Sequence, residues 1–100
     1  MIVLNVTFKS KDNLALLYVK ELESNGMAEY VRHEKGNHKY DYYLPLKENG
    51  EVLLVEKWDT LENLNAHLSS DNIKKMQEIK KKYNIETNLE KYFVEWLWTK

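Results

Sequence analysis

The chain has 100 residues, 43% of them hydrophobic, with 15 basic side chains against 16 acidic ones and no cysteine, which suits a single domain with one modest core. The balanced charge gives no field that would attract nucleic acid or an anionic membrane, and the lack of cysteine excludes disulfides, thiolate metal sites and cysteine nucleophiles. The first residues are unlike a signal peptide and no apolar run approaches the ~18 residues of a membrane span, so we expect a cytoplasmic location.

The first third of the chain predicts a strand and then helix. Apolar residues alternate along residues 2–8, the period-2 pattern of a strand with one buried face. Ser10 can cap a helix that runs to about Ser24. The expected buried stripe of this helix consists of Leu14, Leu17, Tyr18 and Leu22. One or two further helical turns are expected over residues 27–31, before Gly36 stops them.

The middle third predicts an antiparallel hairpin. Residues 38–44 and 52–58 are β-forming runs, and the short polar stretch between them ends in Asn49-Gly50, a turn signal. In the second run, alternation places Glu56 and Trp58 on the same face as Val52 and Leu54.

The last third predicts two helices and a final strand. Asp59 precedes a helix with leucines at positions 61, 64 and 68 and with His67 beside the last of them. Ser70 or Asp71 can cap the next helix, which should turn its lysines outward: Lys74, Lys75, Lys80, Lys81 and Lys82. Residues 84–88 are expected to be a polar link, and the alternation over residues 91–98 predicts the last strand.

The predicted order β-α-β-β-α-β is that of the ferredoxin-like α+β fold, with a four-stranded antiparallel sheet and helices on one face, in one domain over residues 1–100. The other face of the sheet has no cover within one chain. Aromatic residues make up 12% of the sequence and cluster in two of the strands, which is more apolar surface than a small core can hide. We therefore expect a homodimer in which two sheets face each other.

A strand that carries Glu56 and Trp58 and leads into the helix of His67 nominates a site. Histidine titrates near neutral pH, so His67 is the candidate for proton transfer; the alternative interpretation is a histidine that packs or caps at a surface. A buried Glu56 needs a partner, and Trp58 could form the floor of a cavity for a flat ring. Asn5, in an otherwise apolar strand, also needs a partner if it is buried. Three scattered histidines form no recognisable set of metal ligands, so we expect no metal.

The stretches VRHEKGNHKYDYYLPL and EVLLVEKWDTLENLNAHLSSD resemble the antibiotic biosynthesis monooxygenase domain, a family that includes quinol-monooxygenase-like proteins. Its usual motif is a glutamate and a glycine before the second strand, then Glu-x-Trp at the end of the third strand, then a histidine followed by a serine. Here these fall on Glu34 and Gly36, on Glu56 and Trp58, and on His67 and Ser70. The resemblance spans about residues 1–95 and implies a dimeric α/β barrel.

The resemblance also implies a function. It predicts a cofactor-independent monooxygenase that acts on a quinol-like or polyphenolic aromatic with molecular oxygen and without nucleic acid or membrane partners. His67 would transfer the proton, and Glu56 and Asn5 would orient polar groups. Trp58 would contact the substrate ring, and Tyr40 and Trp96 would lie beside the substrate, in the core or at the dimer interface.

Two alternatives stay open. The first is an isomerase that moves protons on a small hydroxy-ketone with the same His67. The second is a non-catalytic module for ligand binding or dimerisation. Haem-degrading relatives carry their iron-ligating histidine on the helix after the serine, where this chain has Met76 and Gln77, so no haem is expected although Asn5 matches a strand asparagine of those relatives.

Overall fold

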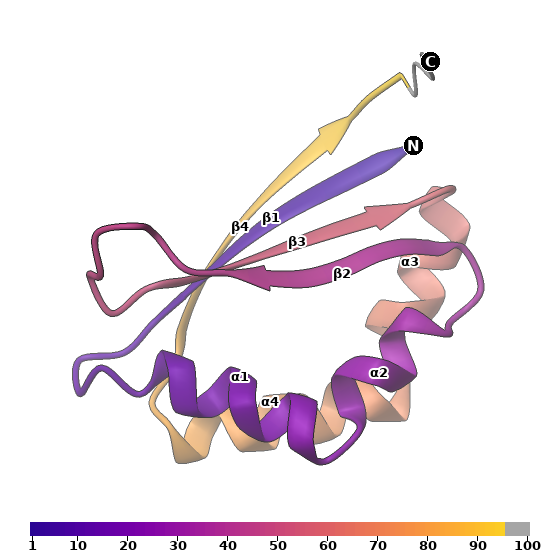
Figure 1. Ribbon diagram of the computed structural model, residues 1–100. Coiled ribbons are helices and arrows are strands. Elements are labelled where there is room, and N and C mark those ends of the chain that lie inside the picture. Colours follow the sequence, from indigo (N-terminus) through magenta and orange to yellow (C-terminus); the bar gives the residue numbers. More distant parts are fainter. Residues whose placement is uncertain (96–100) are drawn as a thin grey trace.

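The computed structural model describes residues 1–95 and has two layers, a twisted sheet and a set of helices that cover one of its faces (Figure 1). The strands are β1 (Ile2–Lys9), β2 (Asn37–Tyr43), β3 (Val52–Trp58) and β4 (Glu86–Phe93), all paired antiparallel in the order β2-β3-β1-β4. The helices are α1 (Ala15–Ser24), α2 (Met27–Arg32), α3 (Leu61–Leu68) and α4 (Asp71–Lys82). The ferredoxin-like α+β prediction is confirmed.

Side-chain alternation along β1 and β3 divides the sheet into a core face and an outer face. Leu4 pairs with Glu56, and both lie on the face that the helices cover. Asn5 pairs with Val55, and both are half-buried on the outer face. The core-face residues of β1 are almost inaccessible, with at most 4% exposed: Ile2, Leu4, Val6 and Phe8.

The first helix begins later than the sequence predicts. Ser10 does not cap it; the Ser10 hydroxyl donates a hydrogen bond of 3.0 Å to the carbonyl oxygen of Tyr83 and ties this link to the end of α4. Because the helix begins at Ala15, its core stripe is Ala15, Tyr18, Val19 and Leu22, at helical spacing. Leu17, predicted to be buried, is 52% exposed, so that part of the prediction is wrong.

The caps of α3 and α4 fix where these helices leave the sheet. Ser70 Oγ accepts a hydrogen bond of 3.2 Å from the backbone N–H of Ile73, which confirms the predicted cap of α4. The cap of α3 is Thr60, whose hydroxyl accepts from the N–H of Asn63, one residue after the predicted Asp59. Asp59 instead accepts a hydrogen bond of 2.9 Å from the Asn63 side chain.

The last strand begins earlier than predicted. β4 pairs with β1 along its whole length, from Glu86 opposite Lys9 to Phe93 opposite Ile2. Residues 86–88, expected to be a polar link, are accommodated because β4 is an edge strand whose side chains are all exposed in one chain. Residues 91–93 belong to this strand as predicted, residues 94–95 do not, and Trp96 and Trp98 lie outside the described residues.

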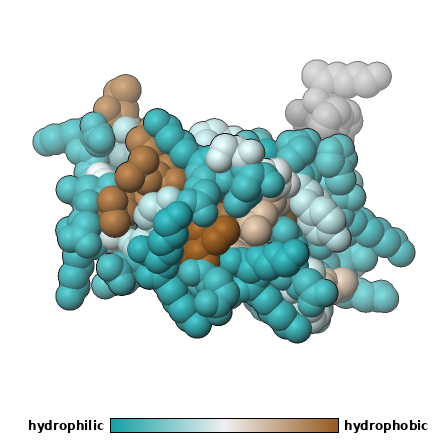
Figure 2. All heavy atoms as spheres, turned by 90° about the horizontal axis from the view of Figure 1, so that it is seen from below, coloured by the Kyte–Doolittle hydropathy of each residue, from teal (hydrophilic) through white to brown (hydrophobic). Residues whose placement is uncertain are grey.

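From the helix side the surface is mainly hydrophilic, and hydrophobic side chains gather at the end of the molecule that carries the β2–β3 loop (Figure 2). Leu44 and Leu46 of that loop are both highly exposed. None of the helices in the described part of the chain is long and apolar enough to cross a membrane.

Candidate functional site

His67 lies near the end of α3 with its side chain turned into the protein, and only 3% of it is exposed. Its Nδ1 atom lies 2.6 Å from Oε1 of Glu34, a short hydrogen bond of the kind that charged groups form. Glu34 comes from the link between α2 and β2, 33 residues earlier in the chain. A buried histidine is therefore held from one side by a carboxylate.

The link that carries Glu34 is fixed by Gly36. This glycine has a φ of +83°, in the left-handed region that favours glycine, and its carbonyl oxygen accepts a hydrogen bond of 3.0 Å from the N–H of Asp59. A Cβ atom at this position would collide with the side chains of Asp59 and Asn63. Gly36 thus lets the α2–β2 link lie against the β3–α3 link, which keeps Glu34 within reach of His67.

Glu56 and Trp58 hold the other side of His67. Both are buried on the core face of β3, with 5% and 0% exposed. The Trp58 ring stacks on the imidazole at a centroid distance of 4.7 Å and 29° between the planes, and Trp58 Nε1 donates a hydrogen bond of 3.0 Å to Glu56 Oε1. The same carboxylate oxygen lies 3.9 Å from His67 Nε2. The two strand residues and the helix histidine thus form one contiguous cluster.

Burial controls the charge of Glu56. Removal of the carboxyl from water raises the pKa of Glu56, an effect that the hydrogen bond from Trp58 and the electrostatic influence of His67 and Lys80 oppose only in part. Burial therefore favours the protonated, uncharged form of this side chain more than it would at a surface. A protonated carboxyl can donate a hydrogen bond as well as accept one.

A cavity of about 110 Å³ opens beside this cluster, between the core face of the sheet and helices α3 and α4. Its buried wall includes Glu56, His67 and Tyr40. Leu68 and Leu89 also line it and are each 49% exposed, so the mouth lies between the helices and the edge strand β4. An apolar cavity of ~150 Å³ holds benzene, and the space beside His67 is smaller. The enclosed part of the cavity therefore has room for no more than one ring.

A larger hollow of about 490 Å³ lies elsewhere, between the start of α1 and the β2–β3 loop. It is lined by exposed or half-buried residues such as Leu17, Pro45 and Glu48. Its lining brings together no buried titratable groups. The cavity beside His67 is the stronger candidate because chemistry needs perturbed and positioned groups rather than volume alone.

The structure brings together four of the six residues that the sequence nominated. His67, Glu56 and Tyr40 line the cavity, with the Tyr40 and His67 rings 6.5 Å apart, edge to face. Trp58 packs behind His67 and Glu56 with no exposed surface and is not among the residues that line the cavity, so its direct contact with a substrate ring stays a prediction.

The other two nominated residues are not part of this cluster. Asn5 projects from the outer face of β1, because its neighbour Leu4 is the residue opposite Glu56 on the core face. The sheet therefore separates Asn5 from His67, and a polar role for Asn5 in the reaction stays a prediction. Trp96 lies outside the described residues.

Glu34 is the hydrogen-bond partner of His67 that local sequence patterns do not predict. Its only signal in the sequence was its place in the motif of the resemblance, because no periodicity connects residues 33 positions apart. Within residues 1–95, no group of three or more histidine and carboxylate side chains is arranged to hold a metal ion. Met76 and Gln77, the residues that this chain has on the helix where haem-degrading relatives carry their iron-ligating histidine, both line the cavity.

The comparisons with known proteins agree with this architecture. The sequence model of the antibiotic biosynthesis monooxygenase family matches residues 1–79. A crystal structure of a proposed antibiotic biosynthesis monooxygenase from Deinococcus radiodurans has a TM-score of 0.82 at 22% identity, covering 99% of this chain and 97% of that one. A proposed antibiotic biosynthesis monooxygenase from Nitrosomonas europaea has a TM-score of 0.80 at 15% identity, covering 96% and 100%.

A third structure, of a conserved protein of unknown function from Bacteroides thetaiotaomicron that is suggested to be an oxidoreductase, has a TM-score of 0.77 at 21% identity and covers 91% of this chain and 94% of that one. At these identities the likeness establishes the fold alone. The comparison with curated proteins finds no match.

Proposed function

The chain belongs to the antibiotic biosynthesis monooxygenase family, and from this premise and the geometry around His67 we propose that it is a cofactor-independent monooxygenase of a small quinol-like or polyphenolic aromatic. The observation that carries the proposal is the two-sided hold on a buried histidine at the wall of a cavity: Glu34 on Nδ1, and Glu56 with Trp58 on the other side. Such a hold is what a general base requires.

Glu34 determines which ring nitrogen of His67 is free to react. An ionised carboxylate only accepts hydrogen bonds, so in the short contact with Glu34 we assign the proton to Nδ1. Nε2 of the neutral ring is then an acceptor on the side of Glu56. When Nε2 takes a proton from a substrate hydroxyl, the negative charge of Glu34 stabilises the imidazolium that forms.

Loss of the hydroxyl proton leaves an electron-rich ring anion that reduces oxygen directly. One oxygen atom enters the ring, the other leaves as water, and all the electrons come from the phenol, which departs as a quinone. The protein has to bind the ring, stabilise the anion and exclude bulk water. Glu56, kept toward its uncharged form by burial, would orient the hydroxyl, and Tyr40 would contact the ring from the wall.

A second candidate is favoured by the same pair of groups. Glu56 Oε1 and His67 Nε2 lie 3.9 Å apart and both can carry a proton, the arrangement that an isomerase of a small hydroxy-ketone uses to move a proton between neighbouring carbons. This reaction consumes no oxygen.

Oxygen consumption separates the two candidates. Hydroquinone and catechol would each be incubated with the protein while oxygen uptake is recorded above the uncatalysed rate. The monooxygenase proposal expects uptake matched by quinone formation, and it would be wrong if a substrate is turned over under anaerobic conditions. Proton exchange in a hydroxy-ketone, followed by NMR without oxygen, would establish the isomerase. Binding without either reaction would leave a non-catalytic module.

The proposal includes a homodimer built from the outer faces of two sheets and a cytoplasmic location. Val3, Leu53 and Val55 are half-buried on that face with no helix over them, and Tyr92 of β4 is 44% exposed. A stable interface should bury more than ~1,200 Å² in total. A mass corresponding to one chain in sedimentation at micromolar concentration would contradict the dimer.

A further inference from the structure

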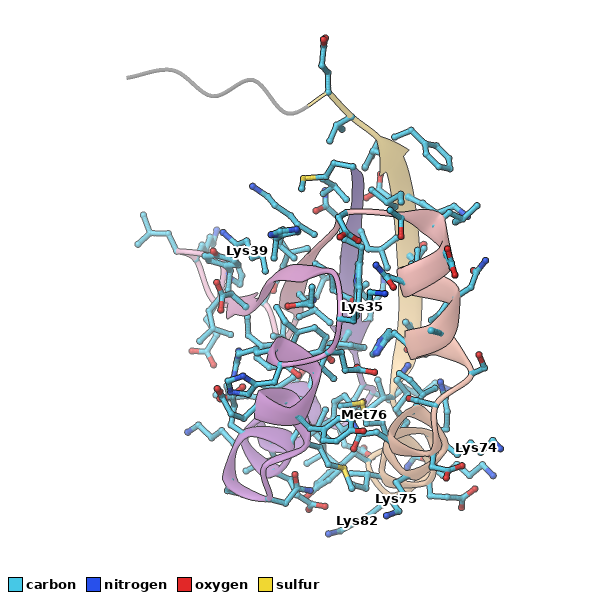
Figure 3. The ribbon with its side chains drawn as sticks, turned by 90° about the vertical axis from the view of Figure 1, so that its right-hand side faces the viewer. Lys35, Lys39, Lys74, Lys75, Met76 and Lys82 are labelled. Carbon is cyan, nitrogen blue, oxygen red and sulfur yellow. The ribbon has the colours of Figure 1, made fainter. Side chains whose placement is uncertain are left out.

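One lysine of α4 differs from the others. Lys74, Lys81 and Lys82 have 75%, 74% and 62% of their side chains exposed, and Figure 3 shows Lys74, Lys75 and Lys82 pointing away from the sheet while Met76 points inward. Lys80, predicted to point outward with them, is half-buried and lines the cavity beside His67. The prediction for Lys80 is wrong because Ile73, Met76, Gln77 and Lys80 share one helix face and all line the cavity.

The ammonium group of Lys80 is not neutralised by a close partner. Its Nζ atom lies over the ring of Phe8, 5.2 Å from the centroid, and Phe8 is itself a cavity residue. None of the ion pairs formed within residues 1–95 includes Lys80. Burial lowers the pKa of Lys80, and the charge of Glu56 acts in the opposite direction. A cation in this position gains free energy when an anion enters the cavity.

The polar groups of the cavity are divided between two ends. Glu56 pairs with Leu4 at one end, where it lies beside His67. Phe8 pairs with Thr87 at the other end, and Lys80 lies over Phe8. Leu4 and Phe8 are four positions apart in β1, which corresponds to about 13 Å of strand.

The two ends also differ in chemistry. The inner end has the base and the carboxyl, His67 and Glu56, both buried. The end of Lys80 has three side chains with hydrogen-bond donors, Lys80, Gln77 and Thr87, and the last two are exposed at the mouth. Ammonium, amide and hydroxyl donors together match the oxygens of a carboxylate or of an ionised hydroxyl.

Resting on the proposed function, we propose that Lys80 is the anion-binding residue of the cavity and that the substrate is a single-ring phenol with an anionic oxygen group across the ring from the hydroxyl that His67 deprotonates. The hydroxyl enters first and meets His67 and Glu56. The anionic group stays near the mouth, where Lys80, Gln77 and Thr87 hold it. The cavity volume of about 110 Å³ limits the substrate to one ring.

The test uses two probes of nearly equal shape, 4-hydroxybenzoate and 4-hydroxybenzamide, which differ in charge. Their dissociation constants would be measured by calorimetry or ligand-observed NMR for the wild type, Lys80→Gln and the matched control Lys75→Gln, which changes an exposed lysine of the same helix. The wild type and the control should prefer the benzoate. Lys80→Gln should lose about tenfold or more of the affinity for the benzoate, the factor of a charge-assisted hydrogen bond, and keep its affinity for the benzamide.

Lys80→Met, which keeps an apolar side chain of similar length, should lose affinity for the benzoate as Lys80→Gln does. Agreement between the two variants would show that the loss comes from the missing charge and not from altered packing. Equal affinity of the wild type for the two probes, failure to bind either probe, or a preference that survives in both Lys80 variants would overturn the inference. Because the readout is binding, it is independent of turnover. A benzoate preference that depends on Lys80 in a protein that consumes no oxygen would support Lys80 and overturn the monooxygenase. Oxygen-dependent oxidation of quinols by a protein that binds the benzoate no better than the benzamide would do the reverse.

Discussion

Leu4 and Asn5 are neighbours in β1, yet they belong to two different surfaces. Leu4 lies opposite Glu56 on the face that the helices cover, whereas Asn5 lies opposite Val55 on the face that has no cover within the chain. On the covered face a carboxyl, an imidazole and an indole are buried in contact with one another. On the outer face, within residues 1–95, the half-buried side chains of β1 and β3 include both apolar and polar residues, such as Val55 and Asn5. A dry, enclosed side is what perturbs and positions titratable groups, so the two faces should respond very differently to substitution.

The largest expected effect is on turnover. His67→Asn should lower the rate constant for a substrate found in the oxygen assay by about 10²- to 10⁴-fold, because it removes the positioned base. His38→Asn, which changes an exposed histidine at the start of β2, is the matched control and should retain the wild-type rate. Comparable rates in all three proteins would move the reaction away from the covered face.

The next effect is on stability. Trp58→Ala removes the fully buried ring that stacks on His67 and should cost about 3–5 kcal/mol in the free energy of unfolding, measured with urea. Val55→Ala in the same strand, on the outer face, should cost clearly less because that side chain is only half-buried. Equal losses in the two variants would show that the faces do not differ in packing.

Glu56→Gln tests how the buried carboxyl of the covered face makes the stability of the protein depend on pH. The pKa of Glu56 is raised by burial, so the folded state holds its proton more tightly than the unfolded state does. The contribution of Glu56 to the stability of the wild type, relative to Glu56→Gln, is therefore fully present below the ordinary pKa of glutamate, which is about 4.3. This contribution is lost as the pH rises through the raised pKa of Glu56 in the folded protein. Urea unfolding of both proteins from pH 4 to 8 would check this, with His67, Lys80 and Glu34 unchanged in both. A gap that stays constant with pH would contradict the burial of this carboxyl.

The smallest effect is expected on the outer face. Asn5→Ala should change stability by no more than about 0.5 kcal/mol and turnover by no more than about twofold, the range of substitutions away from buried networks. The turnover of Asn5→Ala would be measured together with that of His67→Asn on the same substrate, so that the effects of the two faces can be compared directly. A tenfold loss of turnover in Asn5→Ala would restore Asn5 to the reaction and would mean that the outer face takes part.

Sequence patterns predicted the sheet and nominated three residues of the site, Glu56, Trp58 and His67. Period-2 alternation was enough to place Glu56 and Trp58 on one face of β3. The spacing of Leu61, Leu64 and Leu68 predicted α3, but only Leu64 of these three is buried, and His67 rather than Leu68 faces the core. Local patterns could not supply Glu34, whose approach depends on how two links fold against each other at Gly36. They also misplaced Lys80, since a lysine run looks like a solvated face when the cavity it meets belongs to other elements.

Asn5 shows a different limit. Its strand was predicted correctly and its alternation with Leu4 was visible, but only the register with β3 establishes that Asn5 and Glu56 lie on opposite faces. The start of β4 was missed for a related reason. The polar residues 86–88 become a strand because β1 offers a free edge, which no property of those residues reveals.

The most direct test of the account is the position of the proton on His67 in its neutral form. Ring nitrogens of ¹⁵N-labelled protein, observed by NMR through their couplings to ring hydrogens, report which one is protonated. The hydrogen bond to Glu34 predicts a proton on Nδ1 and a bare Nε2, and Glu34→Gln should weaken that preference. A neutral His67 with its proton on Nε2 would contradict the account, because the nitrogen proposed to take the substrate proton would already carry one.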